Sequence, residues 1–102
     1  MKFFIVTCIK EYQETVQQIF KEAHISAFSS TDIVGFKGSN NINIMEEWFA
    51  SGDEEFDSCM LFSFTTDENA NNALDLIVQY NKNNKNNFPF RAFVVPVEKA
   101  SY

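Results

Sequence analysis

Glycine, proline, cysteine and histidine are all scarce in this chain of 102 residues, which has 3 glycines, 2 prolines, 2 cysteines and 1 histidine. With so few glycines, the sequence offers no glycine-rich phosphate-binding loop. The cysteines and the histidine show no zinc-ligand spacing, and no nucleophile–base motif for covalent catalysis is present. These absences predict a protein that is not an enzyme and has no metal site.

Basic residues are also few, with 8 Lys and Arg against 14 Asp and Glu, for a formal net charge of −6. Nucleic acids bind proteins through phosphates neutralised by Lys and Arg, so we expect no nucleic-acid partner. No apolar run approaches the 18 or so residues that a membrane helix needs, so no membrane insertion is expected. The apolar start at residues 3–6 is too short for a signal peptide, which predicts a cytoplasmic protein.

Cys8 and Cys59 each lie inside an apolar, strand-like run. We interpret them as two buried thiols. A disulfide between them is the weaker alternative, because nothing in the sequence indicates export to an oxidising compartment.

Phenylalanine is abundant by contrast, at 12 residues. The chain is predicted to form one domain, residues 1–102, in which strand-like and helix-like patterns follow one another. Strands are predicted at residues 2–9, 25–36, 58–64 and 88–97. A first helix is predicted after the turn at residues 10–13, and it ends at about His24. A second helix is predicted from Thr65 or Thr66 to about Tyr80, with a capping box from Thr65 to Glu68. Residues 81–87 are predicted as a polar loop. This order predicts an α+β, ferredoxin-like βαββαβ fold, a four-stranded antiparallel sheet with two helices on one face.

A long connection between the second and third strands, at about residues 36–57, contains apolar residues at helical spacing. We predict a short amphipathic helix there. Aromatic anchors in loops are typical of interfaces, so these residues are candidates for binding a protein partner: Ile42, Met45, Trp48 and Phe49. The alternative is that the segment folds back and covers its own assembly.

The predicted sheet is apolar on both faces. Besides the face turned to the helices, the first and fourth predicted strands present a second apolar set, Phe3, Ile5, Ile9, Phe93 and Val95. A sheet with one face in water should alternate apolar and polar residues. Burying one large apolar side chain stabilises by about 1.5–3 kcal/mol. We therefore expect the second face to be buried in an oligomer.

The second predicted strand ends in the run Thr31-Asp32-Ile33-Val34-Gly35-Phe36 and opens into the long connection. This run, with the order of elements over nearly the whole chain, resembles the PII signalling proteins and their PII-like relatives in the PII/CutA superfamily. The resemblance implies a homotrimer, with the sheets facing one another around the axis. It also implies a non-catalytic regulatory protein whose long loop, at 36–57, engages a target.

In that family, small ligands bind in clefts between subunits, so the resemblance places Gly35, Phe36 and Lys37 at a ligand site and suggests an adenine nucleotide as the ligand. The family's glycine-rich phosphate loop is replaced here by the Asn- and Lys-rich residues 81–87. Lys37, Lys82, Lys85 and Arg91 could instead converge on an anion. The plain alternatives are solvated lysines, an interface role for Arg91 and a simple bend at Gly35.

Two other functions remain open at this point. A CutA-like trimer associated with divalent metals would use His24 and respond to copper or zinc. A small enzyme on the same fold, such as a monooxygenase-like dimer, would need a pocket between the sheet and the helices.

Overall fold

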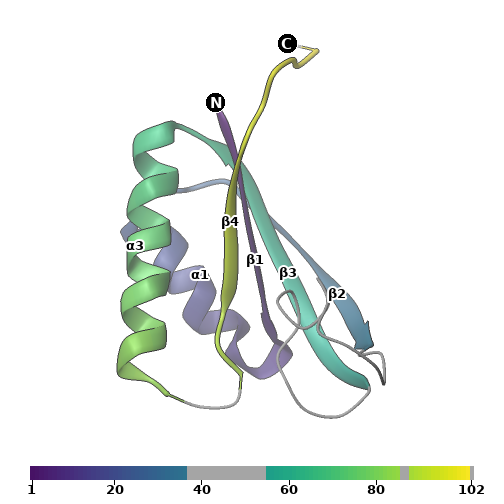
Figure 1. The fold of residues 1–102 in the computed structure, drawn as a ribbon. Helices are drawn as coiled ribbons and strands as arrows, with labels where there is room; N and C mark the ends of the chain where they lie inside the picture. Colours follow the sequence, from purple (N-terminus) through teal and green to yellow (C-terminus); the bar gives the residue numbers. More distant parts are fainter. Residues whose placement is uncertain (37–54, 86–87, 102) are drawn as a thin grey trace, which may run out of the picture.

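One antiparallel sheet of four strands forms a layer, and two helices cover one of its faces, giving the predicted ferredoxin-like α+β fold (Figure 1). The computed structural model describes residues 1–36, 55–85 and 88–101. The elements, in order, are β1 (Lys2–Ile9), the 3-10 helix η1 (Lys10–Tyr12), α1 (Gln13–Glu22), β2 (Ser29–Phe36), β3 (Glu55–Thr65), α3 (Asp67–Asn83) and β4 (Arg91–Pro96).

The strand β1 is central, since the sheet order is β2-β3-β1-β4. Its predicted limits are confirmed, since the near-continuous apolar run is a strand from Lys2 to Ile9. Phe4 and Val6 face the helices and are fully buried. Phe20 of α1 packs on Phe4 with ring centroids 5.5 Å apart, and Leu61 of β3 completes the same layer. The core therefore lies between the sheet and the two helices.

The second strand begins at Ser29, so the predicted start at Ile25 is wrong. His24 has a positive φ of 64° and ends helix α1. The Ile25 N–H then donates to the Phe20 carbonyl over 2.9 Å, and the His24 N–H donates to the Lys21 carbonyl over 3.0 Å. This pair of bonds is a Schellman motif. Because the Ile25 donor closes the helix, Ile25 cannot also begin the strand.

The third strand begins at Glu55, three residues before the predicted start, and ends at Thr65. Val34, Gly35 and Phe36 pair with Asp57, Phe56 and Glu55 in turn. Strand β1 has already ended opposite Ser58, so these three pairs continue as a two-stranded ribbon, which we call the β2–β3 ribbon. The connection between the strands is thus residues 37–54, shorter than the predicted 36–57. The helix predicted inside it lies outside the described residues.

The cap of helix α3 is Thr66, whose hydroxyl oxygen accepts a hydrogen bond of 3.1 Å from the Asn69 N–H. Of the two predicted caps, Thr66 is confirmed, whereas the capping box from Thr65 to Glu68 is wrong. The apolar face of the helix is buried at Ala70, Ala73 and Ile77, whereas Val78 is 46% exposed.

Helix α3 continues to Asn83, so the predicted loop at 81–87 is wrong over residues 81–83, and strand β4 starts at Arg91 and not at the predicted residue 88. The Asn81 side chain explains both differences. Its Nδ2 donates to the Phe90 carbonyl over 2.9 Å, and its Oδ1 accepts from the Phe90 N–H over 3.0 Å. Phe90 is buried and stacks on Tyr80 with ring centroids 4.4 Å apart. Its backbone is therefore paired with the helix and not with the sheet.

Replacing Asn81 with alanine should lower the free energy of unfolding by about 2 kcal/mol, because it leaves both polar backbone groups of Phe90 without a partner in a partly buried place. Urea denaturation followed by circular dichroism measures the change. Asn83→Ala is the matched control: Asn83 is exposed in the last turn of the same helix, and its replacement should change the value by less than about 0.5 kcal/mol. Equal effects of the two substitutions would contradict this role of Asn81.

Candidate functional site

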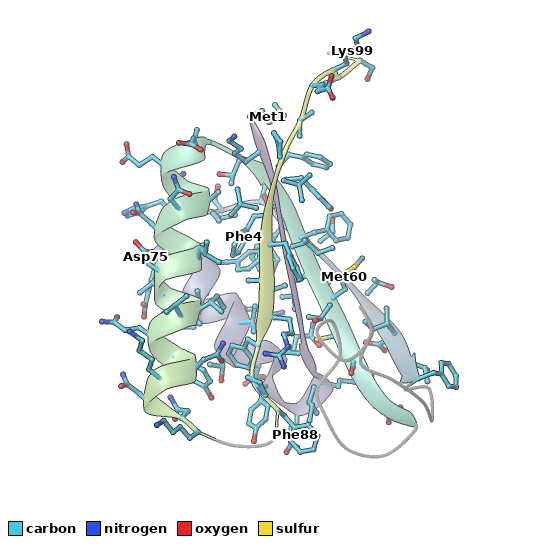
Figure 2. All side chains as sticks on the ribbon, viewed as in Figure 1. Met1, Phe4, Met60, Asp75, Phe88 and Lys99 are labelled. Atoms are coloured by element: carbon cyan, nitrogen blue, oxygen red, sulfur yellow. The ribbon has the colours of Figure 1, made fainter. Side chains whose placement is uncertain are left out.

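The sheet face turned away from the helices is apolar and uncovered by any described helix. We call it the open face. Figure 2 shows Phe4 on the helix side and Met60 on the other side of the sheet. The strand register places these large apolar side chains on the open face: Phe3, Ile5, Met60, Phe62, Phe64, Phe93 and Val95.

Aromatic rings gather at one end of the open face. Phe3 lies between Phe62 and Phe64, with centroid distances of 5.8 Å and 4.9 Å. Phe64 is 54% exposed and Val95 is 43% exposed. Contiguous exposed apolar surface of this kind marks a site of interaction. The sequence prediction that the second face is apolar is therefore confirmed.

Charge is almost absent from this face. By the strand register, Arg91 is the only charged side chain that the described strands place there, since its Cα partner is Thr7 on β1. Asp32, the acidic residue of β2, is on the helix side, because its Cα partner is the core residue Cys59. The open face thus carries one cation and no described carboxylate, in a chain whose net charge is −6.

Arg91 is half-buried at the start of β4. Its Nε atom is buried and has no hydrogen-bond partner among the residues that the structure describes. A buried donor without an acceptor costs about 1–3 kcal/mol. A guanidinium group matches the planar, two-oxygen geometry of carboxylates and phosphates. Arg91 is therefore suited to an anionic acceptor from outside this part of the chain.

The other predicted ligand residues lie apart from Arg91 within one subunit. Gly35 is buried in β2 opposite Phe56, and Phe36 is 55% exposed at the end of that strand. Because β2 continues to Phe36, Gly35 does not bend the chain out of the sheet. Strands β2 and β4 are the opposite edges of the sheet, separated by β3 and β1. Adjacent strands are about 4.8 Å apart, so the two edges are roughly 14 Å apart.

Lys85 is exposed just after helix α3, and Lys82 is exposed in the last turn of that helix. The C-terminal end of α3 lies at the same end of the molecule as the start of β4 and the end of β2 (Figure 1). Other predicted residues lie outside the described residues: Lys37 of the ligand site, and Ile42, Met45, Trp48 and Phe49 of the partner site. One subunit therefore brings the described ligand candidates to one end but not to one point.

An ion pair that the sequence did not indicate lies at the root of the β2–β3 ribbon. The Lys10 ammonium is 2.8 Å from the Asp32 carboxylate, and this hydrogen bond raises the pKa of Lys10. With Ser58 and Asp57, the pair lines a small hollow of about 170 Å³. Both side chains are exposed, so the pair contributes little to stability. Its partners are 22 residues apart, and only the fold brings them together.

The two cysteines are buried and free, which confirms the predicted thiols. They are also in contact, with Sγ atoms 3.3 Å apart. Desolvation by burial is the main cause that raises the pKa of both thiols. Their contact depends on the register between β1 and β3, which the sequence alone does not determine.

The space between sheet and helices is filled by core side chains, where Phe4, Phe20, Val16 and Leu61 are fully buried. A hollow of about 570 Å³ lies instead on the outer surface between α1 and α3, lined in part by Glu14, Gln18, Tyr80 and Asn83. Within residues 1–36, 55–85 and 88–101, no three His, Cys, Asp or Glu side chains are grouped to hold a metal ion.

No protein-family model matches the chain, and a search of curated proteins finds no relative. In the described part of the chain, no helix has the length and apolar character needed to cross a membrane. The fold class is thus established by the structure alone.

Proposed function

We propose that this chain is a PII-like, non-catalytic regulatory protein. It assembles as a homotrimer through the open face, binds a small anion between subunits and engages a protein partner through the segment between β2 and β3. The first ligand to test is an adenine nucleotide. The observation that carries the proposal is the apolar open face, on which Arg91 is the only cation of the described strands and has a buried Nε atom without a hydrogen-bond partner among the described residues.

The distribution of charge supports the proposal that the open face binds a second copy of this chain. Copies with a net charge of −6 repel one another, so self-contact requires a surface without carboxylates. The open face meets that requirement among the described strands, and it offers aromatic rings of the kind enriched at interfaces. The number of three subunits follows from the PII resemblance of the run that ends in Gly35 and Phe36.

The separation of Gly35 and Arg91 supports a ligand site between subunits and not within one. Each lies near a different edge of the sheet, so a cleft that uses both requires edges from two neighbouring copies. In such a cleft, the anion supplies the acceptor that the Arg91 Nε–H lacks. The β2–β3 ribbon extends beyond the end of β1 and includes Gly35, so a ligand at Gly35 would be next in the sequence to the proposed partner-binding segment.

The ligand test is thermal unfolding of the purified protein with ATP, ADP, AMP, cyclic AMP, bicarbonate or 2-oxoglutarate. A ligand at about 100 times its Kd should stabilise by about 2.7 kcal/mol. Arg91→Gln should abolish the shift. The control Lys21→Gln, on the surface of α1, removes the same charge and should preserve the shift. A shift that survives Arg91→Gln would remove Arg91 from the site, and no shift with any anion would contradict the ligand part of the proposal.

A further inference from the structure

The buried thiol pair lies where two strands meet. Cys8 on β1 and Cys59 on β3 are direct Cα partners in the antiparallel register, although they are 51 residues apart in the chain. Their Sγ atoms are 3.3 Å apart. Directly opposed Cα atoms are about 4.5–5.5 Å apart in an antiparallel pair, which is inside the range that a disulfide spans. The two sulfurs are therefore placed to bond without a rearrangement of the fold.

We propose that Cys8 and Cys59 form a redox-active dithiol, which a peroxide converts into a cross-strand disulfide that changes the β2–β3 ribbon. This inference does not depend on the trimer or on the anion site. It concerns a modification within one subunit.

The chemistry is balanced with peroxide as the oxidant. One cysteine, as its thiolate, attacks a peroxide oxygen, the O–O bond breaks, and a sulfenic acid forms while the released hydroxide takes up the thiol's proton as water. The second thiol attacks the sulfenic sulfur, the S–O bond breaks, and its hydroxyl leaves with the second proton as water. Two thiols thus lose two electrons to one hydrogen peroxide, giving one disulfide and two waters.

Burial determines which oxidant fits. Cys59 is fully buried and Cys8 is 5% exposed, so a compact oxidant such as hydrogen peroxide is favoured over a protein disulfide. The raised pKa of each thiol keeps the thiolate fraction small, which makes the first step slow. The second step is fast, because the partner sulfur is already in contact with the sulfenic acid.

The consequence follows from the position of the pair. Opposed Cβ atoms in a sheet are about 4.5–5.5 Å apart, whereas a disulfide holds them at about 3.5–4.5 Å. Bond formation therefore draws β3 toward β1. One register pair beyond, Ile9 opposite Ser58, β1 ends and the ribbon begins. On its other side, Cys59 is paired with Asp32, whose carboxylate holds Lys10. The displacement thus reaches the ribbon through β3 and through this ion pair.

The experiment treats the reduced, native full-length chain with hydrogen peroxide and then alkylates it in denaturant. We expect that neither cysteine is alkylated and that the peptide map shows Cys8 joined to Cys59. The intact mass should be lower than that of the reduced chain by two hydrogen atoms, after allowance for methionine oxidation. A dithiol reductant should restore both thiols. Amide hydrogen exchange should then differ between the oxidised and reduced forms in residues 34–36 and 55–57.

Cys59→Ala and Cys8→Ala are the controls, because each leaves one sulfur that cannot close the bond within the chain. In either variant the remaining cysteine should stop at an oxyacid, with no change of exchange in the ribbon. The wild-type peptide map tests the bond even where a variant fails to fold. Two alkylatable cysteines after native peroxide treatment, or a disulfide that joins two chains, would overturn the proposal. An internal disulfide with unchanged ribbon exchange would overturn its coupling to the ribbon.

Discussion

Replacing Phe4 with alanine should lower the free energy of unfolding by about 3–5 kcal/mol, the usual cost of removing a buried aromatic ring. Phe4 is fully buried in the central strand, and its ring packs on Phe20. The cavity left behind is enclosed by β1, β3 and the two helices, whose backbone hydrogen bonds limit how far they can collapse into it. A typical domain is stable by only about 5–15 kcal/mol, so this one change removes a large share of the total.

Urea denaturation at a fixed protomer concentration measures the effect, since an oligomer's stability depends on concentration. Val78→Ala is the control on the same helix–sheet layer. Val78 is 46% exposed on α3, and its truncation should cost less than about 1 kcal/mol. If Phe4→Leu, which retains most of the buried volume, were as destabilising as Phe4→Ala, the loss would not come from a cavity.

Replacing Phe62 with glutamate should convert the proposed trimer into monomers while leaving the subunit folded. Phe62 lies on the open face between Ile5 of β1 and Ser29 of β2 in the register, and it is only half-buried in the single subunit. In the assembly, the substitution buries one carboxylate per copy. A buried charge without a partner costs several kcal/mol per ion. Arg91 is the only cation that the described strands place on the open face, and strand β1 lies between its strand and that of Phe62.

Size-exclusion chromatography with light scattering gives the mass, and circular dichroism checks the fold. The matched control is Gln79→Glu, which adds the same charge on the exposed surface of α3 and should leave the mass unchanged. A Phe62→Glu protein that kept the wild-type mass would show that the open face is not the interface. A wild-type protein of monomer mass would contradict the assembly itself.

The alternation of side chains between the two faces of a strand was the sequence feature that predicted most of the sheet. The limits of β1 and the division of β1 and β4 into two apolar faces were correct, because a strand's side chains alternate strictly and each face can be read from one segment alone. The fold class followed from the order of elements.

Errors fell where a side chain or a helix end competes for backbone hydrogen bonds. Asn81 binds the backbone of Phe90 and so both lengthens α3 and delays β4. His24 adopts the left-handed conformation that glycine usually takes at a helix end, so no glycine marked the point where Ile25 is used by the helix. Composition favours a loop at Asn81 and a strand at Ile25. The hydrogen-bond partners in the folded chain determine where the helices end and the strands begin.

Contacts between distant strands could not be predicted at all. The approach of Cys8 to Cys59 depends on the register of β1 against β3, and a slip of one residue would turn one thiol to the opposite face. The Lys10–Asp32 pair depends on two registers, that of β1 against β3 and that of β2 against β3. Neither register can be derived from a single strand, because a register is a relation between two strands.

The central position of β1 has a consequence for synthesis on the ribosome. This strand is made before the rest of the described chain, yet it pairs on one side with β3 and on the other with β4, as far as Lys2 opposite Pro96. Such distant pairings slow folding, because long loops must close before the contacts form. Until β4 leaves the exit tunnel, the phenylalanine-rich β1 has no permanent neighbour on that side. The nascent chain is therefore expected to recruit chaperones that shield apolar segments, and to complete its sheet only after the last strand emerges.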